Sequence, residues 1–263
     1  MRLDVFLTNR GDFDSRNKAA AAIKDHWYAV NGKTVSKPSF DITDEDEITA
    51  LKETSVYVAR SAHKLLNANR QFNLNWGGKT VADFGASTGG FCQVLLECDA
   101  ARVYAVDIGT AQLHPTIKED PRIINMEHHN ARYLKADDFP EPIHAITADL
   151  SFISIKAILP AIRDTLVEDG EAVVLIKPQF EAGPQNLSKN GVVRDRKVQL
   201  RVIEEVALFA QNCEFAIKGI AFSGLAGESG NREYLLYLVK DETSSIDISS
   251  AAHAAVYSED HYE

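Results

Sequence analysis

Short apolar runs alternate with amphipathic segments over most of the chain. Runs of four to eight mainly aliphatic residues predict buried strands, and apolar residues at helical spacing predict helices. This alternation is typical of an α/β fold with a doubly wound, mostly parallel sheet, and the last two strands indicate an antiparallel edge. We predict strands at 80–83, 103–106, 123–126, 145–148, 172–176, 215–222 and 234–239, and helices at 60–70, 90–97, 154–166 and 197–211.

The first 52 residues follow a different pattern. A short amphipathic helix at 2–7 precedes a second helix for which Ser15 is the expected N-cap. Asn31-Gly32 between two short apolar runs predicts a hairpin, and 48–51 could form a last strand. We therefore predict a small α+β domain at 1–52, a linker at 53–59 and a main domain at 60–240.

Composition indicates an ordinary globular protein. The 263 residues are 45% hydrophobic and 25% charged, and no apolar run approaches the roughly 20 residues that span a bilayer. Met1 is not followed by a signal-type apolar core, so we expect a cytoplasmic protein without a membrane partner. The three cysteines lack metal-type spacing, and we expect no metal site.

Charge is distributed unevenly along the chain. The net charge of -10 argues against a nucleic-acid partner. However, residues 241–263 contain six acidic and no basic residues, and we expect this segment to be a mobile acidic tail. Residues 1–40 contain seven Lys or Arg against four Asp, which leaves the first domain locally basic.

A glycine-rich stretch at 81–91 breaks the strand at 80–83 and opens the next helix. Gly85, Gly89 and Gly90 would let the backbone approach a ligand closely, and a nucleoside cofactor is the first candidate. Their spacing matches neither a Walker loop nor the dinucleotide fingerprint. On this evidence alone, a plain strand-to-helix turn is an equally good interpretation.

Charged residues follow four of the predicted strands. Asp83, Asp107, Asp149 and Lys177 should meet at the carboxyl edge of the sheet, where doubly wound folds bind ligands. Asp107 is placed to bond ribose hydroxyls, which would suit NAD. Asp83 would repel a pyrophosphate, so the loop suits the amino-acid part of S-adenosylmethionine better. Taken singly, such charges are more often solvated or in structural ion pairs.

Several motifs occur together and in order. They are Arg-Ser-Ala-His-Lys-Leu at 60–65, the glycine stretch, Ala-Asp-Leu-Ser-Phe-Ile-Ser at 148–154, Ile-Lys-Pro-Gln-Phe-Glu-Ala-Gly at 176–183, Gly-Val-Val-Arg-Asp at 191–195 and Gly-Asn-Arg-Glu-Tyr at 230–234. In this combination the chain resembles the TlyA family of rRNA methyltransferases, from residue 1 to about 240. Its first domain resembles the small RNA-binding module of a small-subunit ribosomal protein, through Arg2-Leu3-Asp4, 15–19, 30–33 and Lys37-Pro38.

The resemblance implies an FtsJ-type sheet and an enzyme that uses S-adenosylmethionine to methylate the ribose 2′-oxygen of a cytidine in ribosomal RNA. The substrate would be the large ribosomal subunit and, in some members, the small subunit as well. It implies a catalytic tetrad of Lys64, Asp149, Lys177 and Glu233. It implies cofactor contacts from Asp83, Gly85, Ala86, Ser87, Thr88, Gly89, Gly90, Phe91, Asp107, Glu127, Asn130 and Asp149, and RNA contacts from Arg2, Arg16, Lys18, Lys24, Lys33 and Arg60.

The tetrad suits the reaction. A ribose hydroxyl is a very weak acid, so attack on a methyl sulfonium needs a group that guides its proton and an in-line approach. We expect Lys177 chiefly to orient the hydroxyl, Asp149 and Glu233 to fix the Lys177 ammonium, and Lys64 to hold the nucleotide. Ser61-Ala62, Gly224 and Glu228 depart from the usual family pattern, at the interdomain hinge and the last loop.

Two other functions compete with this one. A ribosome-assembly factor could keep the fold and bind RNA without turnover, although the intact tetrad speaks against it. The haemolysin label of the family would mean a membrane-active protein, but no apolar segment or basic amphipathic helix supports that. The target nucleotide and the oligomeric state are left open by the residues.

Overall fold

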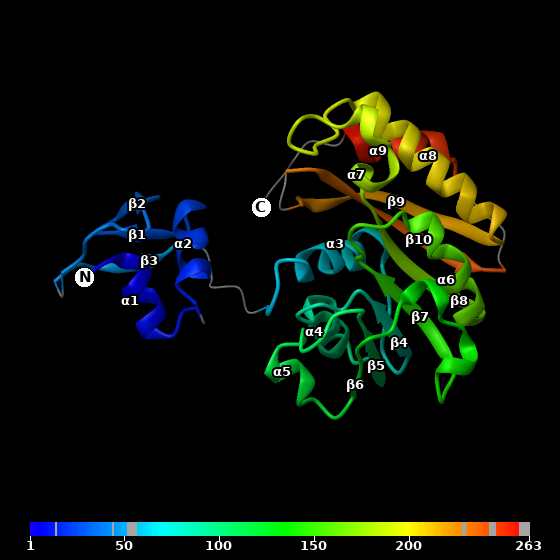
Figure 1. Cartoon of the computed structure of the whole chain (residues 1–263), viewed down its shortest axis with the longest axis horizontal. Coiled ribbons are helices and arrows are strands. Elements are labelled where there is room, and N and C mark those ends of the chain that lie inside the picture. Colours follow the sequence, from blue (N-terminus) through cyan, green and yellow to red (C-terminus); the bar gives the residue numbers. More distant parts are fainter. Residues whose placement is uncertain (14, 44, 52–56, 228–229, 242–245, 258–263) are drawn as a thin grey trace. The chain divides into compact units, whose positions relative to one another are not determined.

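The chain forms two compact units, Met1–Val56 and Tyr57–Glu263 (Figure 1). The computed structural model describes residues 1–13, 15–43, 45–51, 57–227, 230–241 and 246–257. Each unit has a core of its own.

The first unit packs two helices against a three-stranded antiparallel sheet of order β2-β1-β3. The Ser15 hydroxyl accepts a hydrogen bond from the Lys18 amide and caps the second helix, as predicted. Asn31 and Gly32 both adopt positive φ, the geometry that a two-residue hairpin turn requires. The elements are α1 (Leu3–Arg10), α2 (Arg16–Lys24), β1 (Tyr28–Val30), β2 (Lys33–Val35) and β3 (Ile48–Ala50).

The second unit is built on a seven-stranded sheet of order β6-β5-β4-β7-β8-β10-β9. The strands from β6 to β8 are parallel, whereas β10 runs antiparallel to both β8 and β9. The predicted doubly wound sheet with an antiparallel edge is therefore confirmed. The strands are β4 (Thr80–Phe84), β5 (Arg102–Val106), β6 (Ile123–Met126), β7 (Ile143–Ala148), β8 (Leu166–Ile176), β9 (Phe215–Ala226) and β10 (Arg232–Lys240).

Both faces of this sheet are buried. Successive side chains of β4 point to opposite faces, so Val81 lies in one hydrophobic core while Ala82 and Phe84 lie in the other. The first core includes α3 (Ala62–Phe72) and α4 (Gly90–Glu97), and the second includes α6 (Leu159–Thr165), α8 (Arg196–Asn212) and α9 (Ile248–Tyr257). Two short helices were not predicted, α5 (Pro115–Lys118) and α7 (Pro178–Glu181).

The C-terminal segment differs from the expectation. We predicted a mobile tail over 241–263, but Ile248–Tyr257 is the helix α9, which packs against α8 and β9. Ala252, Ala255 and Val256 form a buried stripe at helical spacing, which the acidic composition of the segment had obscured. Residues 242–245 and 258–263 of the predicted tail lie outside the described residues.

The predicted linker at 53–59 is also revised. Tyr57 and Val58 pack against the core of the second unit, and the Val58 amide donates to Gln93 Oε1 at 2.9 Å. The remaining predicted linker residues, 53–56, lie outside the described part of the chain.

Within the described residues, no helix is long and apolar enough to cross a bilayer, and no His, Cys, Asp or Glu cluster could hold a metal ion.

Candidate active site

The glycine turn after β4 brings two chain segments into close contact. A Cβ atom on Gly85 would lie only 3.0 Å from the backbone oxygen of Asp149, and Gly85 has a φ of +84°. No other residue type fits both constraints without strain. The turn can therefore lie directly beside the end of β7.

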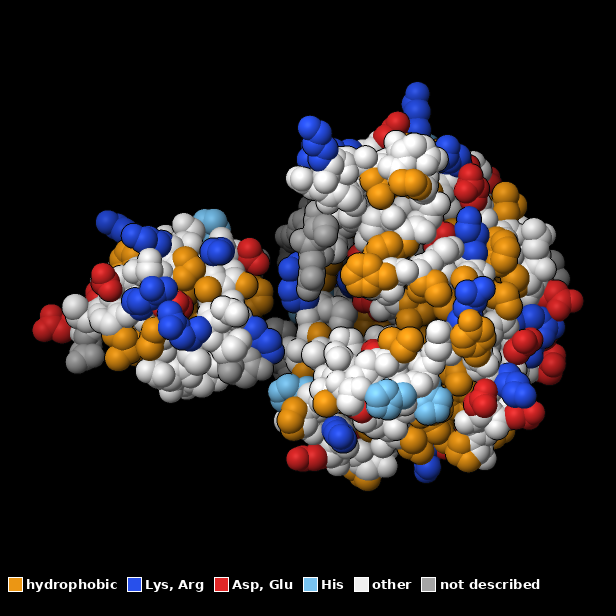
Figure 2. All heavy atoms as spheres, viewed as in Figure 1, with side chains coloured by type: hydrophobic (Ala, Val, Ile, Leu, Met, Phe, Trp, Pro, Cys, Tyr) orange, Lys and Arg blue, Asp and Glu red, His pale blue; other side chains and the backbone are white. Residues whose placement is uncertain are grey.

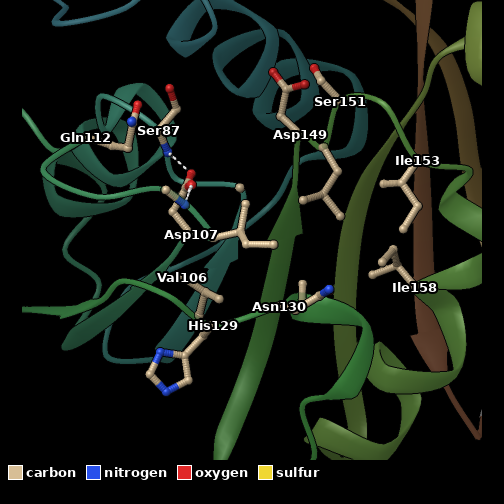
Figure 3. Close-up of a pocket in the computed structure, with 15 residues that line it drawn as sticks. Ser87, Val106, Asp107, Gln112, His129, Asn130, Asp149, Ser151, Ile153 and Ile158 are labelled. Atoms are coloured by element: carbon tan, nitrogen blue, oxygen red, sulfur yellow. Dashed lines mark hydrogen bonds between the residues drawn. The ribbon is translucent and has the colours of Figure 1, made fainter.

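A cavity of about 420 Å³ opens beside this turn, at the carboxyl edge of the parallel strands. Figure 3 shows residues from the turn, from the ends of β5 and β7 and from the loop after β6 around it. Five residues with a predicted cofactor role line it: Gly85, Ser87, Asp107, Asn130 and Asp149.

Asp107 joins two of the loops around the cavity. Its Oδ2 accepts a hydrogen bond from the Ser87 amide at 2.8 Å, and its Oδ1 accepts one from the Gly109 amide at 2.7 Å (Figure 3). Each carboxylate oxygen keeps a further lone pair, so this carboxylate can also receive two hydroxyl groups of a ribose.

Asp83 does not line the cavity. Its side chain is fully buried and accepts hydrogen bonds from Thr147 Oγ1 at 2.8 Å and from Cys92 Sγ at 3.2 Å. Burial, with a smaller contribution from the nearby charges of Asp149 and Asp107, raises its pKa to about 7 against those two hydrogen bonds. Asp83 therefore connects β4, just before the glycine turn, to β7 and α4.

The other residues with a predicted cofactor role do not line the cavity. The Phe91 side chain is buried in the core below the turn. Glu127 accepts a hydrogen bond from Asn125 at 2.9 Å, and this bond is the main cause of its lowered pKa. The remaining residues of this group are Ala86, Thr88, Gly89 and Gly90, all in the glycine turn and the start of α4.

The four residues of the predicted tetrad form one buried cluster. Lys64 Nζ lies 2.6 Å from Glu233 Oε2 and 3.1 Å from Asp149 Oδ2. Lys177 Nζ lies 2.6 Å from Asp149 Oδ1. Two ammonium groups thus alternate with two carboxylates, and Asp149 also lines the cavity.

The pairing fixes the charge of two members. Burial by itself lowers the pKa of Lys64, but the carboxylates of Asp149 and Glu233 outweigh it and raise that pKa above its usual value. Burial also works against the charge of Asp149, yet the ammonium groups of Lys64 and Lys177 lower its pKa. Both side chains are therefore charged at neutral pH.

One expected pairing is different. We expected Glu233 to fix the ammonium group of Lys177, but its carboxylate contacts Lys64. Lys177 instead has the Ser151 hydroxyl as its second partner, at 3.0 Å. Glu233 Oε1 receives a weak hydrogen bond from Gln179 at 3.5 Å. Ser151 and Gln179 belong to the family motifs at 148–154 and 176–183, but no role was predicted for them.

Comparisons with known proteins show the family of the chain. Residues 57–240 match the FtsJ-like methyltransferase family and residues 1–48 match the S4 domain. The chain is 36% identical to a 16S/23S rRNA (cytidine-2'-O)-methyltransferase TlyA of Mycobacterium tuberculosis, over 97% of each protein. The chain belongs to the TlyA family of rRNA methyltransferases.

A further TlyA relative and a solved structure are also similar to the chain. A 23S rRNA (cytidine-2'-O)-methyltransferase TlyA of Campylobacter jejuni is 33% identical, over 92% of this chain and 100% of that protein. A solved structure from Streptococcus thermophilus that carries a hemolysin name is 38% identical, with a TM-score of 0.79 over 97% of this chain and 94% of that one. The FtsJ-like sheet and the small N-terminal domain are thus those of the family.

The predicted RNA contacts of this TlyA chain fall into two groups. Arg2 and Arg16 both contact the buried carboxylate of Asp4, at 2.8 and 3.2 Å, so they also stabilise the S4 domain. The side chains of Lys18, Lys24, Lys33 and Arg60 are exposed. Figure 2 shows Lys and Arg side chains gathered on the visible face of the first unit.

The departures from the TlyA pattern lie near functional elements. Ser61 and Ala62 pack against Gly90, whose added Cβ would lie 2.5 Å from the Ser61 hydroxyl. Gly224 has a positive φ inside β9 and faces Asn67 of α3. Glu228 lies outside the described residues.

Proposed function

We propose that this protein transfers a methyl group from S-adenosylmethionine to the ribose 2′-oxygen of a cytidine in ribosomal RNA. The methylated cytidine would lie in the RNA of the large subunit and, as in the 16S/23S relative, in that of the small subunit as well. The observation that carries it is the buried cluster of Lys64, Asp149, Lys177 and Glu233, which meets the cavity at Asp149. Because ribosomal subunits are the substrate, we propose that the protein acts in the cytoplasm.

The residues around the cavity fit S-adenosylmethionine. The volume of the cavity lies in the range of small-molecule sites. Asp107 can accept from ribose hydroxyls, Ile108 offers an apolar surface to the adenine ring, and Gly85 leaves room for the backbone to approach. The Asp149 carboxylate supplies a negative charge for a positively charged sulfur. When bound, S-adenosylmethionine would supply a methyl group activated by that sulfur.

Lys177 is the residue that we assign to the ribose hydroxyl. Its ammonium group forms an ion pair with Asp149 and donates a hydrogen bond to the Ser151 hydroxyl, and an ammonium group has three N–H donors, so a donor remains for the substrate oxygen. Holding that oxygen fixes the direction of its approach to the methyl group. Lys64 has a raised pKa and two carboxylate partners, so it serves as a charged anchor and not as a base.

Phe152 supports entry of a single nucleotide. It follows Ser151, adopts a φ of +65° and is 92% exposed. An exposed aromatic ring beside the active site can stack on an unpaired base. Enzymes that modify nucleotides commonly take their target base out of the helical stack. We assign Phe152 to that contact.

The basic S4 domain supports the RNA part of the proposal. The exposed Lys18, Lys24 and Lys33 can contact phosphate groups, and Arg2 and Arg16 present positive charge at the same domain. The net charge of -10 does not prevent this, because the first 40 residues are locally basic.

The test is methyl transfer from labelled S-adenosylmethionine to isolated ribosomal subunits, followed by mapping of ribose methylation. We expect 2′-O-methylcytidine with the native protein and none with Lys177→Ala, which should still bind the cofactor in calorimetry. Full turnover by Lys177→Ala would contradict the role of Lys177. RNA binding without transfer to either subunit would favour the assembly factor, and leakage of pure lipid vesicles would favour the membrane-active protein.

A further inference from the structure

The two buried lysines have different partners. Lys64 contacts two carboxylates, those of Asp149 and Glu233. Lys177 contacts one carboxylate, that of Asp149, and one neutral hydroxyl, that of Ser151. Lys177 is thus the lysine that donates a hydrogen bond to a neutral residue outside the charged cluster.

Ser151 stands between the buried cluster and the open cavity. It lies three residues beyond the end of β7, is exposed and lines the cavity, whereas Lys177 is only 7% exposed. Figure 3 shows the Ser151 hydroxyl beside the Asp149 carboxylate, at the same end of the cavity. Ser151 and Asp149 therefore form the part of the cavity wall that contacts the Lys177 ammonium.

We propose that Ser151 is a positioning residue, which aims an N–H of Lys177 at the ribose oxygen. This inference rests on the proposed methyl transfer. An ammonium group has three donors in tetrahedral directions. The ion pair with Asp149 fixes the position of the Lys177 ammonium, and the hydrogen bond to Ser151 fixes its rotation, so together they limit where the other donors point. With Asp149 alone, the group could rotate about its terminal bond, and the flexible lysine chain could shift toward the carboxylate.

Loss of this positioning should lower the rate of methyl transfer. A displacement of about 1 Å in a reacting group can slow a reaction by roughly 100-fold. Loss of one neutral hydrogen bond to a lysine that keeps its Asp149 partner should cost somewhat less. We therefore expect Ser151→Ala to lower kcat by about 10- to 100-fold, with little change in the KM of either substrate.

Ser154 provides a matched control in the same loop. Its hydroxyl donates to Glu181 Oε2 at 2.7 Å, so it has a carboxylate partner outside the tetrad. Ser151→Thr keeps a hydroxyl at the same position and serves as the conservative variant. The melting temperature of each variant separates loss of folding from loss of positioning.

The experiment measures kcat and both KM values for the full chain with S-adenosylmethionine and ribosomal subunits. We expect Ser151→Ala to lose kcat, Ser151→Thr to recover most of it, and Ser154→Ala to keep kcat within about twofold. A wild-type kcat in Ser151→Ala, a loss confined to KM, or no recovery in Ser151→Thr would overturn the role of Ser151 alone. Absence of transfer by the wild-type protein would instead overturn the proposed function, and this inference with it.

Discussion

Glu233 Oε2 lies 2.6 Å from Lys64 Nζ, and both side chains are buried. Removing one partner of such a pair leaves the other charge without compensation, which typically costs about 3 to 5 kcal/mol. Breaking the pair should therefore destabilise the second unit as well as disturb the geometry of the cluster.

We predict that Lys64→Met lowers the free energy of unfolding by about 3 kcal/mol, because it leaves the buried Glu233 carboxylate without a cation, whereas Asp149 keeps Lys177. Adding Glu233→Gln to Lys64→Met should restore part of that loss, because the uncompensated carboxylate is removed. Urea denaturation of the single and double variants measures both effects. Strictly additive losses would show that the two residues are not coupled.

The buried carboxyl of Asp83 should make stability depend on pH. Its pKa of about 7 lies above that of an unfolded Asp, so the folded state binds the proton more tightly. The stabilisation from this proton is complete below about pH 4 and is lost as the pH rises through 7. We predict that Asp83→Asn gains roughly 2 kcal/mol relative to the wild type between pH 5 and pH 8.

Urea denaturation of both proteins across this pH range tests that prediction. Other carboxylates titrate equally in the two proteins, so the difference between them isolates Asp83. A difference that is constant with pH would mean that Asp83 has an ordinary pKa in the folded protein.

Exposed lysines of the first unit should contribute to RNA affinity without affecting folding. We predict that Lys24→Gln and Lys33→Gln each weaken binding to ribosomal RNA and reduce the slope of log affinity against log salt by about 1. The melting temperature should not change, because both side chains are exposed. Lys118→Gln, an exposed lysine of the second unit, is the control. An unchanged salt slope would remove these two lysines from the interface.

Phe152 should matter for the substrate and not for the fold. A ring that is 92% exposed contributes little to stability, whereas stacking on a base is worth about 1 to 3 kcal/mol. We predict that Phe152→Ala lowers kcat/KM for ribosomal subunits by about 5- to 100-fold and that Phe152→Trp retains most activity. Leu208→Ala, at another exposed apolar residue, controls for surface effects. Equal activity of Phe152→Ala and the wild type would exclude the stacking role.

The sequence was sufficient for most elements of the fold because their signals are local. The Ser15 cap, the Asn31-Gly32 turn and the apolar runs of β4 to β8 each fit within a few residues. The helix α9 was missed because its apolar stripe consists mainly of small alanines in an acidic segment. Their burial depends on contacts with α8 and β9, which no local pattern contains.

For the site, the sequence predicted which residues belong to it but not how they pair. Family motifs identified the four charged residues, but their pairings depend on packing between distant segments. The register pairs Tyr234 with Ile176, which brings Glu233 and Lys177 to the same edge, yet the Glu233 carboxylate contacts Lys64 of α3. Asp83 likewise stands at a strand end, where a ligand contact is expected. Its side chain instead meets Thr147, 64 residues further along the chain.

The contact between Lys64 and Glu233 joins positions 169 residues apart. During synthesis, the residues of the first unit leave the ribosome long before β10 does, and domains generally fold in that order. A growing chain therefore acquires its S4 domain early and its chemistry only near the end. A truncated product that ends before Glu233 would therefore contain the S4 domain but lack the complete cluster.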